Sequence, residues 1–180
     1  MKKSILSILV CAIALVFSND TLAQNFRKID KSPMDATAYP TDWKNPDKLA
    51  KVVYSRPQLK GRSLDKLAPK GKVWRTGANE AVEITFYKDV TFGGKPVKAG
   101  TYTLFTIPGD NEWTVILSTA RNVWGAYFYN ESEDVVRVMA KVSKAKSTLE
   151  VFSMAFDGKG NDADLYMGWG DVLVSVPVKG

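Results

Sequence analysis

The sequence predicts an all-β protein: a single-domain antiparallel β-sandwich, jelly-roll-like, with an irregular N-terminal arm. Short segments of alternating apolar and polar residues recur along the chain, and turn residues separate them. After residue 23 the sequence contains no segment with the period of a long amphipathic helix. The composition does not shift along the chain, so one domain is expected.

The first 23 residues, 1–23, predict a signal peptide. Lys2 and Lys3 precede an apolar run at 5–17, and Thr21-Leu22-Ala23 is a small-residue cleavage site. The run is shorter than the roughly 20 residues of a membrane-spanning helix, although an uncleaved anchor is the alternative. We therefore expect an exported protein, periplasmic or extracellular, with no transmembrane segment after signal cleavage.

The cysteine and histidine content excludes several kinds of catalytic site. Cys11 is the single cysteine and lies in the signal, and the chain has no histidine. The mature chain therefore has no disulfide framework, thiol nucleophile, imidazole base or Cys/His zinc site. We expect neither a cofactor nor a metal.

The net charge of the mature chain favours an anionic environment. Without Lys2, Lys3 and Asp20, the chain after residue 23 has 23 basic and 18 acidic residues, a net charge of +5. Such a balance fits the surface of a bacterial envelope. Nucleic acid is not an expected partner, because the lysines are scattered rather than gathered in a stripe. The sequence carries no signal for an oligomeric state.

Residues 24–50 are expected to form an extended arm on a β-sandwich domain at 51–180. Three prolines prevent a helix in the arm, and several apolar residues suggest that it is docked on the domain. These apolar residues are Phe26, Ile29, Met34, Tyr39 and Trp43. A packed linker is the simpler interpretation of the arm, and a lid is the alternative.

Strands are expected where apolar residues alternate or gather between turns. In chain order they lie at 51–55, 82–92, 95–97, 101–107, 113–117, 136–142, 148–156, 165–169 and 172–178. Arg56-Pro57 ends the first strand, and a short helical turn is expected at 64–67. In the second strand, Val82, Ile84 and Phe86 alternate with polar residues, the period of a half-buried strand.

Turns and one irregular segment separate the later strands. Gly93-Gly94 predicts a two-residue hairpin. The strand at 101–107 is apolar on both faces, which is typical of the centre of a sandwich. Proline, glycine and asparagine form turns at 108–111 and 157–161. Residues 118–132 are irregular and rich in aromatic side chains.

The stretch Trp74-Arg75-Thr76-Gly77-Ala78-Asn79-Glu80 is the strongest candidate for a binding site. Arg75 offers a fork of donors that fits carboxylate, phosphate or sulfate. Asn79 and Glu80 would add polar contacts, and Trp74 a flat surface for stacking. These groups precede a strand, where loop side chains converge in concave faces. In the structural alternative, Arg75 pairs with Glu80, and Asn79 caps a turn.

Two further segments are candidates for the same pocket. Tyr54 and Arg56 would form its second side; alternatively they are a strand end with a solvated arginine. Trp124 would provide an aromatic platform beside Gly125; alternatively, its side chain is part of the hydrophobic core. The turn after Asp157 resembles a calcium loop in composition, but its spacing matches no EF-hand, and a polar hairpin turn is favoured.

Several motifs resemble those of one family. KVVYSRPQLKGR, GKVWRTGANEAVEITF, GGKPVKAGTYTLFTIPG, EWTVIL and WGAY occur in this order. Together they resemble a domain-of-unknown-function family of exported bacterial proteins, the 2911 type, from about residue 32 to residue 178. The resemblance implies an exported, all-β, single domain. It implies no activity, because the family has no established one.

Three functions remain open. The first is a non-enzymatic envelope module that binds a small polar or anionic ligand, or a glycan, through Arg75, Asn79 and Glu80. The second is a carboxylate-based, glycoside-type hydrolase that uses Glu80; Glu83 would face the other way if the strand began before Glu80. The third is a structural or partner-binding protein in which the Arg75 cluster locks the core. We favour the first, because no motif marks a catalytic centre.

Overall fold

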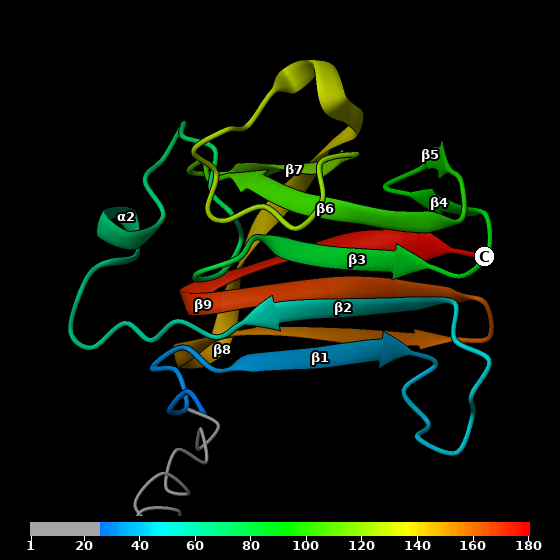
Figure 1. The fold of residues 1–180 in the computed structure, drawn as a ribbon, viewed down its shortest axis with the longest axis horizontal. Helices are drawn as coiled ribbons and strands as arrows, with labels where there is room; N and C mark the ends of the chain where they lie inside the picture. Colours follow the sequence, from blue (N-terminus) through cyan, green and yellow to red (C-terminus); the bar gives the residue numbers. More distant parts are fainter. Residues whose placement is uncertain (1–25) are drawn as a thin grey trace, which may run out of the picture.

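The computed structural model describes residues 26–180 (Figure 1), so the expected signal peptide at 1–23 lies outside the described residues. In this part of the chain, strands are accompanied only by the short helix α2 (Leu64–Leu67) and the 3-10 turn η1 (Glu131–Glu133). No helix of residues 26–180 has the length and apolar character needed to cross a membrane. The predicted all-β fold is confirmed.

Residues 26–180 contain nine strands, all paired antiparallel in one continuous sheet. They are β1 (Met34–Tyr39), β2 (Ala50–Ser55), β3 (Val82–Phe86), β4 (Val90–Phe92), β5 (Lys95–Val97), β6 (Gly100–Ile107), β7 (Glu112–Ser118), β8 (Asp134–Lys159) and β9 (Asp162–Lys179). Their order is β1-β2-β3-β6-β7-β8-β9-β4-β5. In Figure 1, β8 and β9 pass behind β1, β2 and β3, so the sheet folds over itself as a sandwich.

β8 connects the two layers because its partner changes along its length. Its first part pairs with β7, and its later part pairs with β9. The register shifts between Lys144 and Leu149 and again between Leu149 and Ser153. Such irregularities insert unpaired residues and bend a strand. The strands predicted at 136–142 and 148–156 are therefore two parts of one bent strand.

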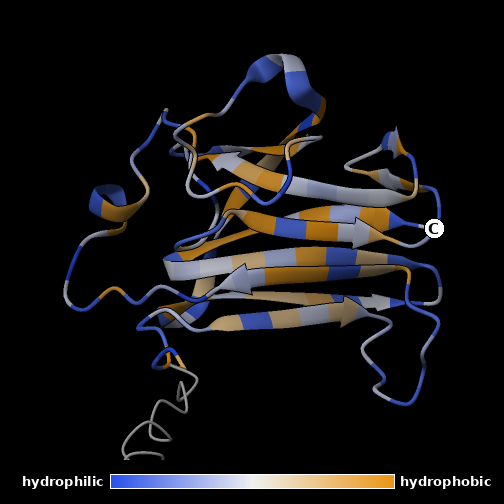
Figure 2. Ribbon diagram, viewed as in Figure 1, coloured by the Kyte–Doolittle hydropathy of each residue, from blue (hydrophilic) through white to orange (hydrophobic). Residues whose placement is uncertain are grey.

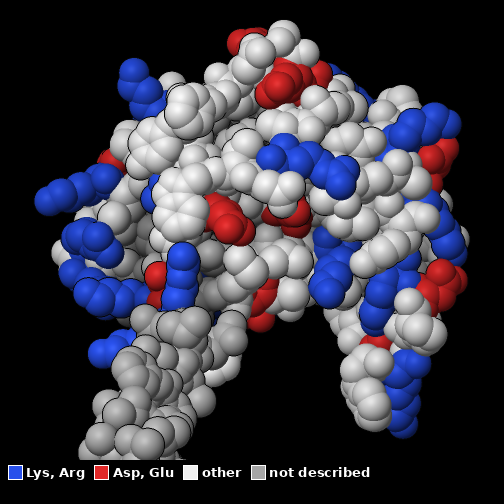
Figure 3. Space-filling view, in the orientation of Figure 1, with Lys and Arg blue, Asp and Glu red and all other residues white. Residues whose placement is uncertain are grey.

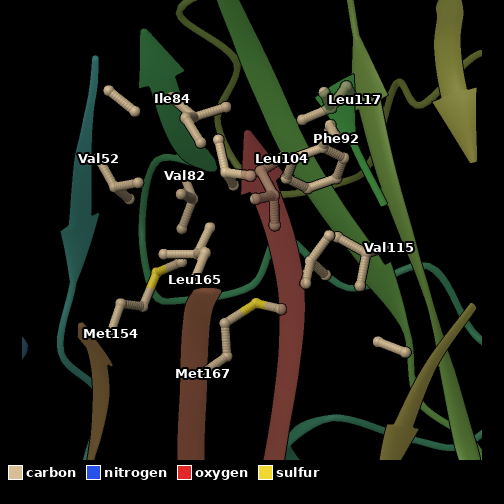
Figure 4. Close-up of a cluster of buried hydrophobic side chains, with 14 of the residues drawn as sticks. Val52, Val82, Ile84, Phe92, Leu104, Val115, Leu117, Met154, Leu165 and Met167 are labelled. Atoms are coloured by element: carbon tan, nitrogen blue, oxygen red, sulfur yellow. The ribbon is translucent and has the colours of Figure 1, made fainter. Parts of the chain in front are cut away.

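The core lies between the two layers. Val52, Ile84 and Leu104 from the first layer are fully buried in one cluster with Leu165 and Met167 of β9 (Figure 4). Figure 2 shows apolar and polar residues interleaved along the strands, as the period-2 pattern predicts.

A smaller cluster covers the opposite face of β6 and β7. It contains Phe105 and Ile116, which Val123, Ala126 and Tyr129 of the following irregular segment cover. Both faces of β6 are therefore covered by apolar groups, as its sequence predicts. The segment between β7 and β8 is tied to this second face.

Within the described residues 26–50, the arm is less irregular and less docked than expected. Its residues Met34–Tyr39 form the edge strand β1, which pairs with β2. Tyr39 is buried, and its hydroxyl donates to the Gly160 carbonyl at 3.0 Å. The other apolar members of the arm, Phe26, Ile29, Met34 and Trp43, are exposed, so the prediction that they dock is wrong.

The strand predicted at 82–92 is two strands. β3 ends at Phe86, and β4 then pairs with β9 rather than with the neighbours of β3. Asp89 stabilises the break, because its carboxylate accepts a hydrogen bond from the Ala99 N–H at 2.9 Å. The predicted hairpin is confirmed: Gly93 and Gly94 join β4 to β5 with φ of 57° and 81°, the positive values that a tight hairpin requires.

Candidate functional site

Residues 74–80 form a tight loop that backbone hydrogen bonds fix at both ends. Trp74 pairs with Thr106 of β6, at N···O distances of 2.7 and 3.0 Å. At the other end, Glu80 forms a bridge with Trp124, and the Gly125 N–H donates to the Asn79 carbonyl at 2.9 Å. This pairing brings Trp124 beside the loop, as the hypothesis of a common site requires.

Two residues of this loop have left-handed backbone conformations. Asn79, with φ of 60°, belongs to a residue type that tolerates this region, but Thr76, with φ of 59°, is β-branched and strained there. Thr76 is fully buried, and its hydroxyl lies 3.1 Å from the Thr106 hydroxyl and 3.3 Å from the Trp74 carbonyl. Strain held by its surroundings is a mark of functional segments.

Trp74 belongs to the core. Its side chain is 7% exposed, and its ring stacks on Trp169 with centroids 5.6 Å apart. Trp113 and Phe152 contact it edge-on at 6.0 and 5.3 Å. Most of this ring is therefore inaccessible to a ligand, contrary to the stacking role expected from the sequence.

Arg75 lines a hollow of about 560 Å³ that we call the basic hollow. Its lining includes four basic side chains and no acidic one. Around these lie Trp74 and Trp169 together with small and polar residues. The full lining is Lys31, Ser32, Pro57, Gln58, Lys60, Arg62, Leu67, Trp74, Arg75, Gly77, Ala78 and Trp169. Figure 3 shows basic side chains gathered at the side of the molecule that carries α2.

The four basic side chains come from three separate segments; the nearby carboxylates are Glu150, which accepts from the Lys60 N–H at 2.7 Å, and Asp30, which adjoins Lys31. Among residues 26–180, none of Lys31, Lys60, Arg62 and Arg75 forms an ion pair. Arg62 donates to the carbonyls of Gln58 and Leu59, both at 2.8 Å. Arg75 donates from Nε to the carbonyl of Gly77 at 3.3 Å. The hollow therefore concentrates positive charge.

Asn79 and Glu80 lie outside the basic hollow. The Ser32 N–H and the Asn79 side chain hold the pKa of Asp30 below its ordinary value, which places Asn79 beside that carboxylate. Glu80 is exposed, and it forms no ion pair with Arg75 within the described part of the chain, so the structural pairing considered from the sequence is wrong.

Glu80 and Glu83 line one small hollow of about 90 Å³. The strand β3 begins only at Val82, so the strand alternation that would separate the two carboxylates does not apply. Glu83 accepts a hydrogen bond from the Asn122 N–H at 3.0 Å.

Tyr54 and Arg56 do not line the basic hollow; Tyr54 instead lines the small hollow with Glu80 and Glu83, and both residues have structural contacts. The buried Tyr54 hydroxyl donates to the Met154 carbonyl at 3.3 Å, accepts from the Met154 N–H at 3.1 Å, and burial raises its pKa. Arg56 donates to the Phe152 carbonyl, the Ser153 hydroxyl and the Asp35 carboxylate, at 3.3, 2.8 and 3.0 Å. Together these bonds tie β1 and β2 to β8.

Trp124 is exposed, as a platform requires. It is 58% exposed, and Tyr127 and Phe128 are 75% and 89% exposed; we call these three side chains the aromatic tip. Gly125 has φ of 70°, and a Cβ at this position would lie 2.6 Å from the Tyr127 ring and 3.4 Å from Arg75 Nη1. A glycine is therefore required where the tip meets the arginine.

Sequence reasoning identified Arg75 and missed its basic partners Lys31, Lys60 and Arg62. The local signal for two of them was the run Lys60-Gly61-Arg62 after the first strand. The predicted polar turn after Asp157 is the hairpin between β8 and β9, but it is shorter than the expected range 157–161, because β8 continues to Lys159 and β9 begins at Asp162. Residues 26–180 contain no group of three His, Cys, Asp or Glu side chains placed to hold a metal ion.

One comparison with known proteins gives a match. A family model described as "Protein of unknown function (DUF2911)" matches residues 32–178, a range that contains β1 to β8, most of β9 and the basic hollow except Lys31. No curated protein and no solved structure matches the chain.

Proposed function

We propose that this chain, which belongs to the DUF2911 family of proteins of unknown function, is an exported, non-enzymatic module of the bacterial envelope that binds a small anionic ligand. The ligand would occupy the basic hollow. The observation that carries this proposal is the lining: four basic side chains, and no acidic one, around about 560 Å³. Small-molecule sites in proteins have volumes of roughly 300–1,000 Å³.

The chemistry of the lining favours an anion over a neutral ligand. Lys31, Lys60, Arg62 and Arg75 repel one another, and an anion among them would relieve this repulsion. Hydrogen bonds between ionised partners are about twice as strong as neutral ones. The Arg75 guanidinium matches the planar geometry of a carboxylate and the edges of phosphate or sulfate.

The competing functions receive less support from the same geometry. Glu80 and Glu83, the carboxylates available to a hydrolase, line a hollow of about 90 Å³, well below the size of a sugar-binding site. The purely structural function suits Arg56, whose guanidinium bonds three groups, better than it suits Arg75.

A thermal-shift experiment on residues 24–180 tests the proposal. The probes are inorganic phosphate, sulfate, glucuronate and glucose 6-phosphate, with glucose as the neutral control. An anion at 100 times its dissociation constant adds about 2.7 kcal/mol to stability. At roughly 2–4 °C per kcal/mol, the shift is easily measured, and it should shrink as salt rises.

Three variants that each remove one positive charge test whether the thermal shift arises from binding in the basic hollow. Arg75→Gln and Lys60→Gln should abolish it. Lys51→Gln, an exposed site on β2 outside the hollow lining, removes the same charge and should leave it intact. An equal loss in all three variants, or no shift with any anion, would overturn the proposal.

A further inference from the structure

We infer that the ligand is an acidic oligosaccharide, with its anionic sugar in the basic hollow and an adjacent uncharged sugar stacked on the aromatic tip. This inference rests on the proposed function and adds to it a ligand class and a second subsite. It is carried by the contact between the two surfaces and by the exposure of the tip.

Backbone pairing joins the loop that lines the basic hollow to the segment that carries the aromatic tip. Gly77 and Ala78 line the hollow. The next residue, Asn79, accepts the backbone hydrogen bond from Gly125, and Glu80 bridges Trp124. The wall of one surface is therefore continuous with the base of the other.

Gly125 adjoins both Arg75, the proposed anion-binding group, and Tyr127 of the tip. The position of its absent Cβ is 3.4 Å from Arg75 Nη1 and 2.6 Å from the Tyr127 ring. The guanidinium and the ring thus flank a single backbone position. A chain of sugars that is held at Arg75 by one anionic group therefore reaches Tyr127 with its neighbouring ring.

The tip is exposed although its loop is firmly held. Tyr129 packs edge-on against Phe105 at 5.2 Å, and its hydroxyl donates to Asp134 at 2.6 Å. The Ala81 N–H donates to the Val123 carbonyl at 2.9 Å. Because the loop is anchored, the exposure of these aromatic rings is not due to a loosely packed segment. Exposed apolar patches of this kind are typical of binding surfaces. Tyr and Trp combine an apolar face with a polar group, which suits the C–H face and hydroxyls of a sugar.

The charges near the tip favour an uncharged sugar there. Exposed Glu80 bridges Trp124, and Glu133 follows in the segment that carries the tip, whereas Glu131 is paired with Arg137. Glu80 and Glu133 would repel a second anionic sugar and a membrane of anionic lipid, but they accept hydrogen bonds from sugar hydroxyls. The ligand class is therefore an oligosaccharide in which a neutral sugar adjoins an acidic one.

Titration calorimetry with a monomer and an oligomer tests this inference. The probes are glucuronate and a tetrasaccharide in which glucuronate alternates with N-acetylglucosamine. Wild-type protein should bind the tetrasaccharide at least tenfold more tightly than glucuronate. Trp124→Ala and Tyr127→Ala should each remove most of this gain and leave glucuronate binding unchanged, whereas Arg75→Gln should weaken both probes.

Trp43→Ala is the matched control, because Trp43 is 85% exposed in the β1–β2 loop, at the end of β2 away from the hollow. It should retain the full gain. If glucuronate binds but both tip variants retain the gain, the second subsite is overturned and the anion site stands. If neither probe binds, the inference is overturned; phosphate or sulfate binding that Arg75→Gln abolishes would still support the proposed function. Circular dichroism verifies that each variant is folded.

Discussion

The indole rings of Trp74 and Trp169 stack in the core with their planes 15° apart, and both residues also line the basic hollow. Trp169 is held in turn by its Nε1–H, which donates to the Glu150 carbonyl at 3.3 Å. The loop at 74–80 therefore begins in the core and leads directly to the proposed anion-binding residue. The stacked pair fixes the position from which Arg75 extends.

Replacement of Trp74 should damage stability rather than only binding. Trp74→Ala is expected to lower the free energy of unfolding by about 3–5 kcal/mol, because a buried tryptophan in contact with three aromatic rings leaves a large cavity. Chemical denaturation measures the loss. Trp124→Ala, at an exposed ring, should change stability by no more than about 0.5 kcal/mol. Equal losses in the two variants would contradict the assignment of Trp74 to the core.

A second prediction follows from the left-handed backbone conformation of Asn79. Asn79→Ala is expected to lower the free energy of unfolding by about 1 kcal/mol, because alanine tolerates positive φ poorly. Asn79→Gly enters this region freely and should stay within about 0.5 kcal/mol of wild type. Thermal or chemical denaturation distinguishes the two.

The glycine variant also separates backbone geometry from ligand contact. Asn79 lies beside Asp30 and does not line the basic hollow, so Asn79→Gly should retain the anion-dependent thermal shift. Loss of that shift in a variant as stable as wild type would show that the Asn79 side chain contacts the ligand, as the sequence hypothesis holds.

Arg56 should act as a structural tie between the layers. Arg56→Met removes donors to the Phe152 carbonyl and the Ser153 hydroxyl and should lower the free energy of unfolding by about 1.5–3 kcal/mol. The ion pair with Asp35 is partly exposed, so its coupling energy in a double-mutant cycle with Asp35→Asn should be below about 1 kcal/mol. Chemical denaturation of wild type, the two single variants and the double variant measures both the loss of stability and the coupling energy. Loss of anion binding in a stable Arg56→Met variant would refute the structural role.

The strands with a regular period were predictable from local sequence. Val82, Ile84 and Phe86 alternate in the sequence, and all three are buried. β1 was missed because it is an edge strand whose side chains are mostly exposed or half-buried, so burial imposes no apolar period on it. The continuity of β8 was missed because its two parts pair with different strands, and pairing is set by the tertiary fold.

The candidate site was predictable only in part, for a related reason. Arg75 was identified by its polar neighbours in the sequence. Lys31 and Lys60 reach the same hollow from segments before β1 and after β2, so only the folded chain brings them together. The burial of Trp74 and Tyr54 was not predictable, because an aromatic side chain in a sequence carries no sign of which face of the sheet buries it.

Asp134 should give the protein a measurable pH dependence of stability. Its Oδ2 accepts from Tyr129 and lies 3.5 Å from Arg137 Nη1, but its buried Oδ1 has no hydrogen-bond partner within residues 26–180. Burial, reinforced by Glu131 and Glu133, raises the pKa of Asp134 above its ordinary value of 3.8, in spite of Tyr129 and Arg137.

A carboxyl group with a raised pKa binds its proton more tightly in the folded state, so its contribution to the free energy of unfolding falls as pH rises from 3.8 through the raised pKa. Asp134→Asn cannot titrate. Its stability relative to wild type should therefore increase across this interval and be constant above it, apart from a fixed offset due to the buried amide. Denaturation between about pH 3.5 and 7 measures the difference. If Asp134→Asn runs parallel to wild type, or loses stability relative to wild type as pH rises, burial does not control this carboxylate.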